Sequence, residues 1–418
     1  MQEQAQFDLW VDGQVKERLR VATDWQSLLC ALPGVYPSVV LESVRRVGLE
    51  HLLVTCPRRQ RTAAASFAMG LWVDGILPTP HPLDGTWWYA DNSLETLLHL
   101  IESCTNSYDR VLMLGTPSLF RFSVGRKLRR ELTCVDRGDV GLFNAGHESL
   151  VEDLLLRQPR LSRPAAAIVA DPPWYSRETR AFLLMARRNA LHGGRVLLSV
   201  PPIGTRPGIQ REWEEMVLWA AQIGLELIDY RYGVLPYVSP LFERNALKAA
   251  GIPECPADWR RGDLAIFRSV DREALESEAS FAPDVAWREC SMGGVRVRVQ
   301  GHSRGWKNPE LREIVPGNVL PSVSRRDRRL SEIDVWTSGN RVYRCENPAL
   351  LLLIGSALAA GECPLEYVRS RVGPGLDTES ASQIHQAAEQ LREITEIEDQ
   401  EAEDWKQTTH DHLVPNTT

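Results

Sequence analysis

The residues best suited to chemistry stand together at Asp171-Pro172-Pro173-Trp174, directly after the apolar segment 165–170. A carboxylate accepts hydrogen bonds, and an indole ring offers a flat face on which a planar base can stack. Two consecutive prolines stiffen the chain between these side chains, because each proline fixes its own φ angle. The same four residues could form a proline-containing surface turn. Their place between an apolar strand and a predicted helix favours an active-site loop.

A second group of candidate residues follows two earlier strands. Thr116 and its neighbours come directly after the apolar segment 110–114, and Asp136 ends the segment 131–136. An acid at the end of the second strand can bind the ribose hydroxyls of a nucleotide, although a plain surface acid is the alternative. Residues that could line an adenine pocket beyond it are Asp139, Asn144 and His147.

Strands and helices alternate through residues 105–270, and this alternation must position both groups. The predicted strands are 110–114, 131–136, 165–170, 196–200, 225–230 and 263–267. The predicted helices between them are 119–130, 148–157, 177–190 and 210–223. Such alternation predicts an α/β fold with a doubly wound, Rossmann-like and mostly parallel sheet. The interval between the second and third predicted strands is short, so we expect one element there to be reduced or missing.

The Asp171–Trp174 loop, in this setting, resembles motif IV, written D/N-P-P-Y/W, of the amino-methyltransferases. These belong to the class I S-adenosylmethionine-dependent methyltransferase family. The resemblance implies methyl transfer to an exocyclic amino nitrogen, most readily adenine N6 in nucleic acid. In that reaction Asp171 and the Pro172 carbonyl would accept hydrogen bonds from the amine. Pro173 would help to aim the loop, and Trp174 would stack on the base.

No metal is expected, because the cysteines and histidines show no clustered ligand pattern. The resemblance also implies S-adenosylmethionine as cofactor. Its methionine end would lie against the loop after the first strand, where the family usually carries G-x-G-x-G. This chain keeps only Gly115 there, and small residues still allow the close backbone approach that binding needs. The residues expected to hold the cofactor are Leu114, Gly115, Thr116, Pro117, Ser118, Asp136 and Asn144.

Four regions are expected along the chain. Residues 1–104 are expected to form a winged-helix-like and linker region. Its Arg45 and Arg46 could contact nucleic acid, or the region could be a packing or dimerisation module. Residues 105–270 form the Rossmann-like methyltransferase domain. The period-two pattern at 295–299 indicates a β-rich accessory region over 271–376, and residues 377–418 predict an acidic helix and tail.

The net charge of −7 is concentrated at one end of the chain. Residues 377–418 carry 11 acidic and two basic side chains, which leaves +2 for the rest. Within 291–330 nine basic residues stand against three acidic ones, and nucleic acid is a possible partner there. A solvated loop, or a cradle for the acidic helix, explains the same charges. The densest run is Arg325, Arg326, Arg328 and Arg329.

Composition narrows the class of protein further. The eight cysteines are scattered without a C-x-x-C pair, so a structural zinc site or a disulfide framework is not expected. No apolar run reaches the length of a membrane span, and the first residues do not resemble a signal peptide, so we expect a cytoplasmic protein. A homodimer is possible. P-loop and G-x-G-x-x-G fingerprints are absent, which disfavours an NTPase or a nicotinamide dehydrogenase.

Two other functions fit the same residues. A winged-helix-like start followed by a D-P-P loop also resembles the branched-chain polyamine synthases, which transfer aminopropyl groups from decarboxylated S-adenosylmethionine. A cationic amine acceptor needs a strongly acidic pocket, and few acids flank Asp171 in the sequence. The second alternative is a non-catalytic methyltransferase-like scaffold that binds nucleic acid or protein, for which the reduced glycine loop is the best support.

Overall fold

The chain forms two compact units, each built from segments that are distant in sequence. The first unit takes Met1–Pro78, Trp87–Ser239 and Glu254–Ala282; the second takes Thr79–Thr86, Pro240–Pro253 and Pro283–Thr418. The four sequence regions given above stay a prediction. The computed structural model describes residues 2–22, 24–49, 67–138, 140, 147–252, 255, 259–270, 286–300, 308–373 and 376–410.

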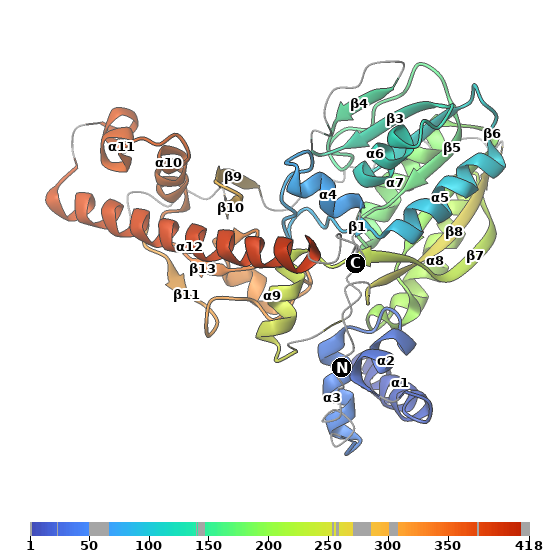
Figure 1. The fold of residues 1–418 in the computed structure, drawn as a ribbon, viewed down its shortest axis with the longest axis horizontal. Helices are drawn as coiled ribbons and strands as arrows, with labels where there is room; N and C mark the ends of the chain where they lie inside the picture. Colours follow the sequence, from blue (N-terminus) through green and yellow to red (C-terminus); the bar gives the residue numbers. More distant parts are fainter. Residues whose placement is uncertain are drawn as a thin grey trace, which may run out of the picture. The chain divides into compact units, whose positions relative to one another are not determined.

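An eight-stranded sheet forms the centre of the first unit, with strand order β1-β7-β8-β6-β5-β2-β3-β4 (Figure 1). The parallel pairs are β2 with β3, β2 with β5, β3 with β4, and β5 with β6, while β8 is antiparallel to β6 and β7. This confirms the predicted Rossmann-like sheet. The strands are β1 (Trp88–Tyr89), β2 (Arg110–Leu114), β3 (Glu131–Asp136), β4 (Glu148–Val151), β5 (Ala165–Ala170), β6 (Ala190–Val200), β7 (Leu225–Val238) and β8 (Arg261–Ser269).

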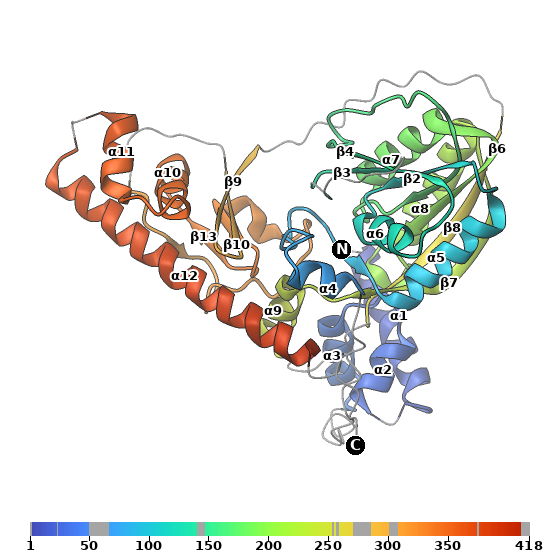
Figure 2. The same ribbon diagram turned by 45° about the horizontal axis from the view of Figure 1, so that its top comes forward.

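Two pairs of helices cover the sheet. α5 packs on α6, and α7 packs on α8; each pair also contacts strands of the sheet (Figures 1 and 2). The side chains of α7 and α8 that face the strands are apolar and join one buried core with them. This burial drives the layers together. The bounds are α5 (Asp91–Cys104), α6 (Pro117–Gly125), α7 (Ser176–Asn189) and α8 (Ile209–Gln222).

The prediction of a helix at 148–157 is wrong. Its first residues form β4, which satisfies its backbone groups by pairing with the edge strand β3. Asp153 then closes a turn, because its carboxylate accepts a hydrogen bond from the Leu155 amide at 2.9 Å. Pro159 disfavours helical backbone in the residue before it and so limits any helix that could follow. The reduction expected in this interval is therefore the loss of a helix over 152–164.

Four described helices precede the sheet in the first unit: α1 (Gln2–Arg18), α2 (Trp25–Ala31), α3 (Pro37–Arg46) and α4 (Phe67–Val73). The first three share a small buried core. Asp24 caps α2, since its carboxylate accepts a hydrogen bond from the Ser27 amide at 2.7 Å. Residues 50–66 lie outside the described residues, so a winged helix stays a prediction.

The second unit contains a five-stranded antiparallel sheet of order β11-β13-β12-β10-β9, which agrees with the expected β-rich region. Its helices include the long acidic α12, and α10 and α12 join the strands in one core. Among the described helices, none is both long and apolar enough to cross a bilayer. The elements are α9 (Leu241–Ala249), β9 (Trp287–Met292), β10 (Val295–Gln300), β11 (Arg312–Glu313), β12 (Val335–Thr337), β13 (Val342–Arg344), α10 (Pro348–Ala359), α11 (Pro364–Val372) and α12 (Thr378–His410).

Candidate active site

The two predicted loops meet where β2 and β5 end. The Asp171 amide donates a hydrogen bond to the Leu114 carbonyl at 3.0 Å, which continues the parallel ladder into the loop. Gly115 adopts a φ of 65°, and a Cβ there would lie 3.0 Å from the Asp171 carbonyl oxygen and 2.9 Å from Phe182. Glycine alone fits this backbone at low cost. Since β3 and β5 flank β2 on opposite sides, this is the switch point at which doubly wound sheets bind ligands.

A chain of polar side chains leads to the Asp171 carboxylate. Tyr237, on β7, donates a hydrogen bond from Oη to Asp171 Oδ1 at 2.9 Å. Ser199 Oγ, on β6, is hydrogen bonded to the same Tyr237 hydroxyl. The Trp174 indole donates from Nε1 to Ser199 Oγ at 3.4 Å. Two strands of the sheet, β6 and β7, therefore hold the side chains of the D-P-P-W loop in place.

The Asp171 carboxyl titrates near neutral pH. Burial raises its pKa from 3.8 to about 7, and hydrogen bonding with Tyr237, Ser199 and Tyr89 opposes part of this rise. Burial, reinforced by the nearby Asp171 carboxylate, raises the pKa of Tyr89 and Tyr237 well above 10. Both tyrosines are therefore neutral donors at physiological pH. A buried carboxyl whose pKa is shifted toward neutral pH is typical of a functional site.

Aromatic rings surround this carboxylate. Tyr89 stacks on Tyr237 with ring centroids 5.1 Å apart, and Trp174 meets Tyr237 edge-on at 5.7 Å. Close packing here needs Gly262 on β8, since a Cβ there would lie 3.1 Å from both the Trp174 and Tyr237 rings. The Tyr89 hydroxyl is buried here, and its hydrogen bonding favours the ionised form of Asp171.

A cation completes the aromatic wall. The Arg260 guanidinium lies 4.6 Å from the Trp87 ring centroid, 4.9 Å from that of Trp259 and 5.6 Å from that of Trp174. Stacked guanidinium groups bind phosphate and planar rings well. The site thus combines one carboxylate, several hydroxyls and one cation with flat hydrophobic surfaces.

The residues predicted to hold the cofactor lie at the same end of β2 and β3. Leu114 and Ser118 are buried, and Pro117 begins α6. Thr116 is 1% exposed, and its Oγ1 has no hydrogen-bond partner within the described chain. An orphaned hydroxyl beside a glycine cradle fits a bound polar ligand.

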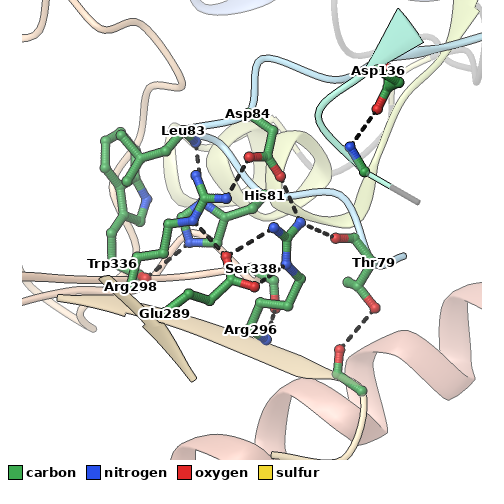
Figure 3. Close-up of polar contacts among 12 residues, drawn as sticks. Thr79, His81, Leu83, Asp84, Asp136, Glu289, Arg296, Arg298, Trp336 and Ser338 are labelled. Atoms are coloured by element: carbon green, nitrogen blue, oxygen red, sulfur yellow. Dashed lines mark hydrogen bonds and ion pairs between the residues drawn. The ribbon is translucent and has the colours of Figure 1, made fainter. Parts of the chain in front are cut away.

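Asp136 and the residues after it complete the cofactor side. Asp136 Oδ1 accepts a hydrogen bond from the Gly138 amide at 2.7 Å, which holds the carboxylate at the end of β3 (Figure 3). Burial lowers the pKa of His147 below 6.5, and this side chain lies just before β4. Asp139 and Asn144 lie outside the described residues. The described positions suit the adenosine part of S-adenosylmethionine.

Several residues of the site were missed in the sequence. Ser199, Tyr237 and Arg260 come from β6, β7 and the approach to β8 respectively, far in sequence from the D-P-P-W loop. Tyr89 lies in the predicted winged-helix-like and linker region, yet Trp88–Tyr89 pairs with β7 at the sheet edge. The available signal was positional: Ser199 stands near the carboxyl end of a strand adjacent to β5.

The basic segment of the second unit is partly neutralised from within. Arg296 and Arg298 both pair with Asp84 and Glu289, and Asp84 lies 2.6 Å from Arg296 (Figure 3). Arg329 pairs with Asp327 at 2.6 Å. Arg325 donates to the Leu83 carbonyl, and Arg326 and Arg328 lie beside it in sequence. Binding of nucleic acid by Arg325, Arg326, Arg328 and Arg329 stays a prediction.

Comparison with known proteins gives similarity of structure only. The chain matches no protein-family model and no curated protein sequence. It is similar to the branched-chain polyamine synthase of Thermus thermophilus at 16% identity and a TM-score of 0.48, covering 66% of this chain and 92% of that one. It is also similar to the N-methyltransferase NodS of Bradyrhizobium japonicum, with S-adenosyl-L-homocysteine bound, at 16% identity and a TM-score of 0.28, covering 43% and 90%. The chain is similar to TrmN of Thermus thermophilus at 15% identity and a TM-score of 0.28, covering 42% of this chain and 48% of that one.

Proposed function

We propose that this protein is a methyltransferase that uses S-adenosylmethionine to methylate an exocyclic amino nitrogen of a planar base, with adenine N6 in nucleic acid as the preferred acceptor. The observation that carries the proposal is the Asp171 carboxylate, held at the switch point of the sheet and enclosed by aromatic rings. A carboxylate at this position can orient an amine, and the rings can hold the plane that bears it.

The chain's own groups account for the orientation step. Oδ1 of Asp171 accepts the hydrogen bond from Tyr237, and Oδ2 would accept one from an amine hydrogen of the substrate. The Pro172 carbonyl would accept the second, which leaves the nitrogen lone pair directed at the donor. When bound, S-adenosylmethionine supplies an electrophilic methyl group. Gly115, Thr116 and Asp136 would hold it, and the transfer is then mostly a matter of alignment.

The charge of the site favours a neutral acceptor over a polyamine. Burial raises the pKa of Asp171 to about 7, and the hydroxyls of Tyr237, Ser199 and Tyr89 oppose part of that rise. A polyamine carries several positive charges and gains most from carboxylates that stay fully ionised at neutral pH. A neutral exocyclic amine needs only a hydrogen-bond acceptor.

The first test is calorimetric titration with S-adenosylhomocysteine. We expect micromolar binding to the native chain and at least about tenfold weaker binding to Asp136→Ala, a loss of about 1.4 kcal/mol. Asp136→Asn is the matched control, because its amide oxygen can still cap the Gly138 amide while the charge is lost. No binding by a chain that melts cooperatively would remove the cofactor from the proposal and favour a scaffold.

The second test is methyl transfer from labelled S-adenosylmethionine to single-stranded DNA, RNA and free adenosine. We expect Asp171→Asn to lower kcat/KM by at least about a hundredfold while cofactor binding persists, since the positioning carboxylate acts on the acceptor. Spermidine with decarboxylated S-adenosylmethionine is assayed in parallel. Turnover only in that mixture would assign aminopropyl transfer instead.

A further inference from the structure

The hydrogen-bonded chain behind Asp171 has a direction that the side-chain chemistry restricts. It runs from Trp174 Nε1 to Ser199 Oγ, from there to Tyr237 Oη, and ends at Asp171 Oδ1. An indole N–H can only donate, and an ionised carboxylate can only accept. Each hydroxyl between them owns a single hydrogen. With Asp171 ionised, every hydrogen points toward Asp171, and all the groups of the chain are satisfied.

The opposite arrangement is poorer. If Oδ1 carried a proton and donated it to Tyr237, Tyr237 would turn its hydrogen to Ser199. Ser199 Oγ would then receive two donors, and its own hydrogen would lose the Tyr237 acceptor. Ser199 is only 1% exposed, so water is a poor replacement for that acceptor. A buried hydroxyl left unsatisfied costs about 1–3 kcal/mol, so a neutral Asp171 carries its proton on Oδ2 and still accepts from Tyr237 at Oδ1. That hydrogen bond is stronger to an ionised carboxylate than to a neutral carboxyl, so the donor chain favours ionisation of Asp171.

We infer that Trp174 is a positioning residue for the proposed reaction: its indole N–H fixes the direction of the Ser199–Tyr237 chain, so that Asp171 presents an ionised carboxylate with Oδ2 toward the substrate amine. This rests on the proposed function and deepens it. It assigns the fourth residue of the D-P-P-W loop a role as donor as well as a surface for stacking. Any proton that Asp171 takes from the amine is received at Oδ2, with an N–H bond broken and an O–H bond formed.

The surroundings of the chain support this reading. Gly262 lets the rings of Trp174 and Tyr237 approach closely, which holds two members of the hydrogen-bonded chain in place. Tyr89 stacks on Tyr237 and restricts its ring. The groups that face Asp171 from the neighbouring strands are Tyr89, Ser199 and Tyr237, and Arg260 lies over Trp174. Because the pKa of Asp171 is raised to about 7, a change in the chain moves its ionisation through the range where activity is measured.

The test compares Trp174→Phe with Trp87→Phe. Both substitutions take one tryptophan from the rings that surround Arg260, but only Trp174→Phe removes the donor to Ser199. Titration of Asp171 is followed without substrate, as the infrared band of a protonated carboxyl between pH 5 and pH 9. The spectrum of Asp171→Asn is subtracted, because Glu398 also has a pKa of about 7.

We expect Trp174→Phe to shift the Asp171 midpoint upward by about one pH unit, so that the ionised fraction below the midpoint falls about tenfold. Trp87→Phe leaves the midpoint unchanged. Ser199→Ala breaks the chain at the next link and shifts the midpoint in the same direction. An unchanged midpoint in both Trp174→Phe and Ser199→Ala would overturn the inference.

The kinetic readout separates donation from stacking. If the protein transfers methyl groups, kcat/KM of the Trp174→Phe variant at pH 6.5 falls about tenfold and recovers toward the native value at pH 9. An equal loss at every pH, with no shift of the profile, means that Trp174 acts only as a stacking surface. If the infrared midpoint of Asp171 shifts but the protein methylates no substrate, the inference about Trp174 stands and the proposed reaction is rejected.

Discussion

The carboxyl of Asp171 carries a stability consequence of its own. The folded chain binds its proton more tightly than the unfolded chain does, because its pKa rises from 3.8 to about 7 on folding. Between these two values the unfolded state has lost the proton and the native state has kept it. The contribution of Asp171 to stability therefore falls as pH rises through this window, and it stays low above pH 7.

Asp171→Asn removes this loss, so the variant should be more stable than the native chain above neutral pH. We expect the difference in Tm, variant minus native, to grow from pH 4.5 to pH 8 in differential scanning calorimetry. The contribution of Glu398 cancels in this difference because both chains keep it. A pH-independent difference would mean that Asp171 titrates at its ordinary value. A gain in stability with a loss of activity is the pattern expected of a functional residue.

At the same scale, the sequence predicted the residues that strand ends bring together and missed those that tertiary packing adds. Gly115 and Asp171 follow apolar strands, and their strand-end positions alone predict proximity. Tyr237 and Tyr89 reach the carboxylate through the pairing of β1 with β7, which local periodicity does not encode. Trp174 was expected to stack on a base; its hydrogen bond to Ser199 could be seen only in the fold.

At the scale of elements, the turn from β2 into α6 depends on Gly115. We expect Gly115→Ala to lower the free energy of unfolding by about 1–3 kcal/mol and to abolish binding of S-adenosylhomocysteine, because the new Cβ meets Phe182 and the Asp171 carbonyl. Gly193→Ala is the control: it has a similar φ of 76° but open space around its Cβ. Denaturant unfolding measures both. Equal losses would mean that backbone strain alone, and not the close approach of the two loops, requires glycine.

The same scale shows where periodicity succeeds and fails. Strands β2, β3 and β5 match the predicted segments residue for residue, because buried parallel strands are continuous apolar runs. The helix α1 was not anticipated, since its buried residues Val11 and Val15 stand among polar ones. The segment 148–157 has apolar residues at helical spacing, but strand pairing with β3 satisfies its backbone better.

At the scale of the whole molecule, the assignment of segments to units could not be predicted. Thr79–Thr86 and Pro240–Pro253 belong to the second unit although first-unit segments flank each of them. His81 illustrates the cause: it is fully buried, with Nε2 3.0 Å from the Trp336 carbonyl oxygen across more than 250 residues. Contacts of this separation leave no periodic signal in the sequence.

A buried acid links the C-terminal helix to the rest of the second unit, in addition to the apolar core that they share. Glu398, on α12, is 1% exposed and accepts a hydrogen bond from the Gly339 amide at 2.7 Å. Arg341 approaches it at 3.3 Å and also pairs with Glu401 at 2.7 Å. Burial raises the pKa of Glu398 from 4.5 to about 7, and the Arg341 charge opposes that rise. The Arg341 cation therefore lowers the free-energy cost of burying an ionised Glu398 at neutral pH.

Arg341→Met should therefore destabilise the second unit by about 3–5 kcal/mol at pH 8, because it leaves a buried carboxylate without its cation. Hydrogen exchange should rise in peptides from 384–405, while Arg344→Met, which removes only an exposed ion pair with Glu332, changes it little. Lowering the pH to 5.5 protonates Glu398 and should restore much of the protection. Protection that is lost equally at both pH values would mean that the packing of the Arg341 side chain, and not its charge, holds α12 in place.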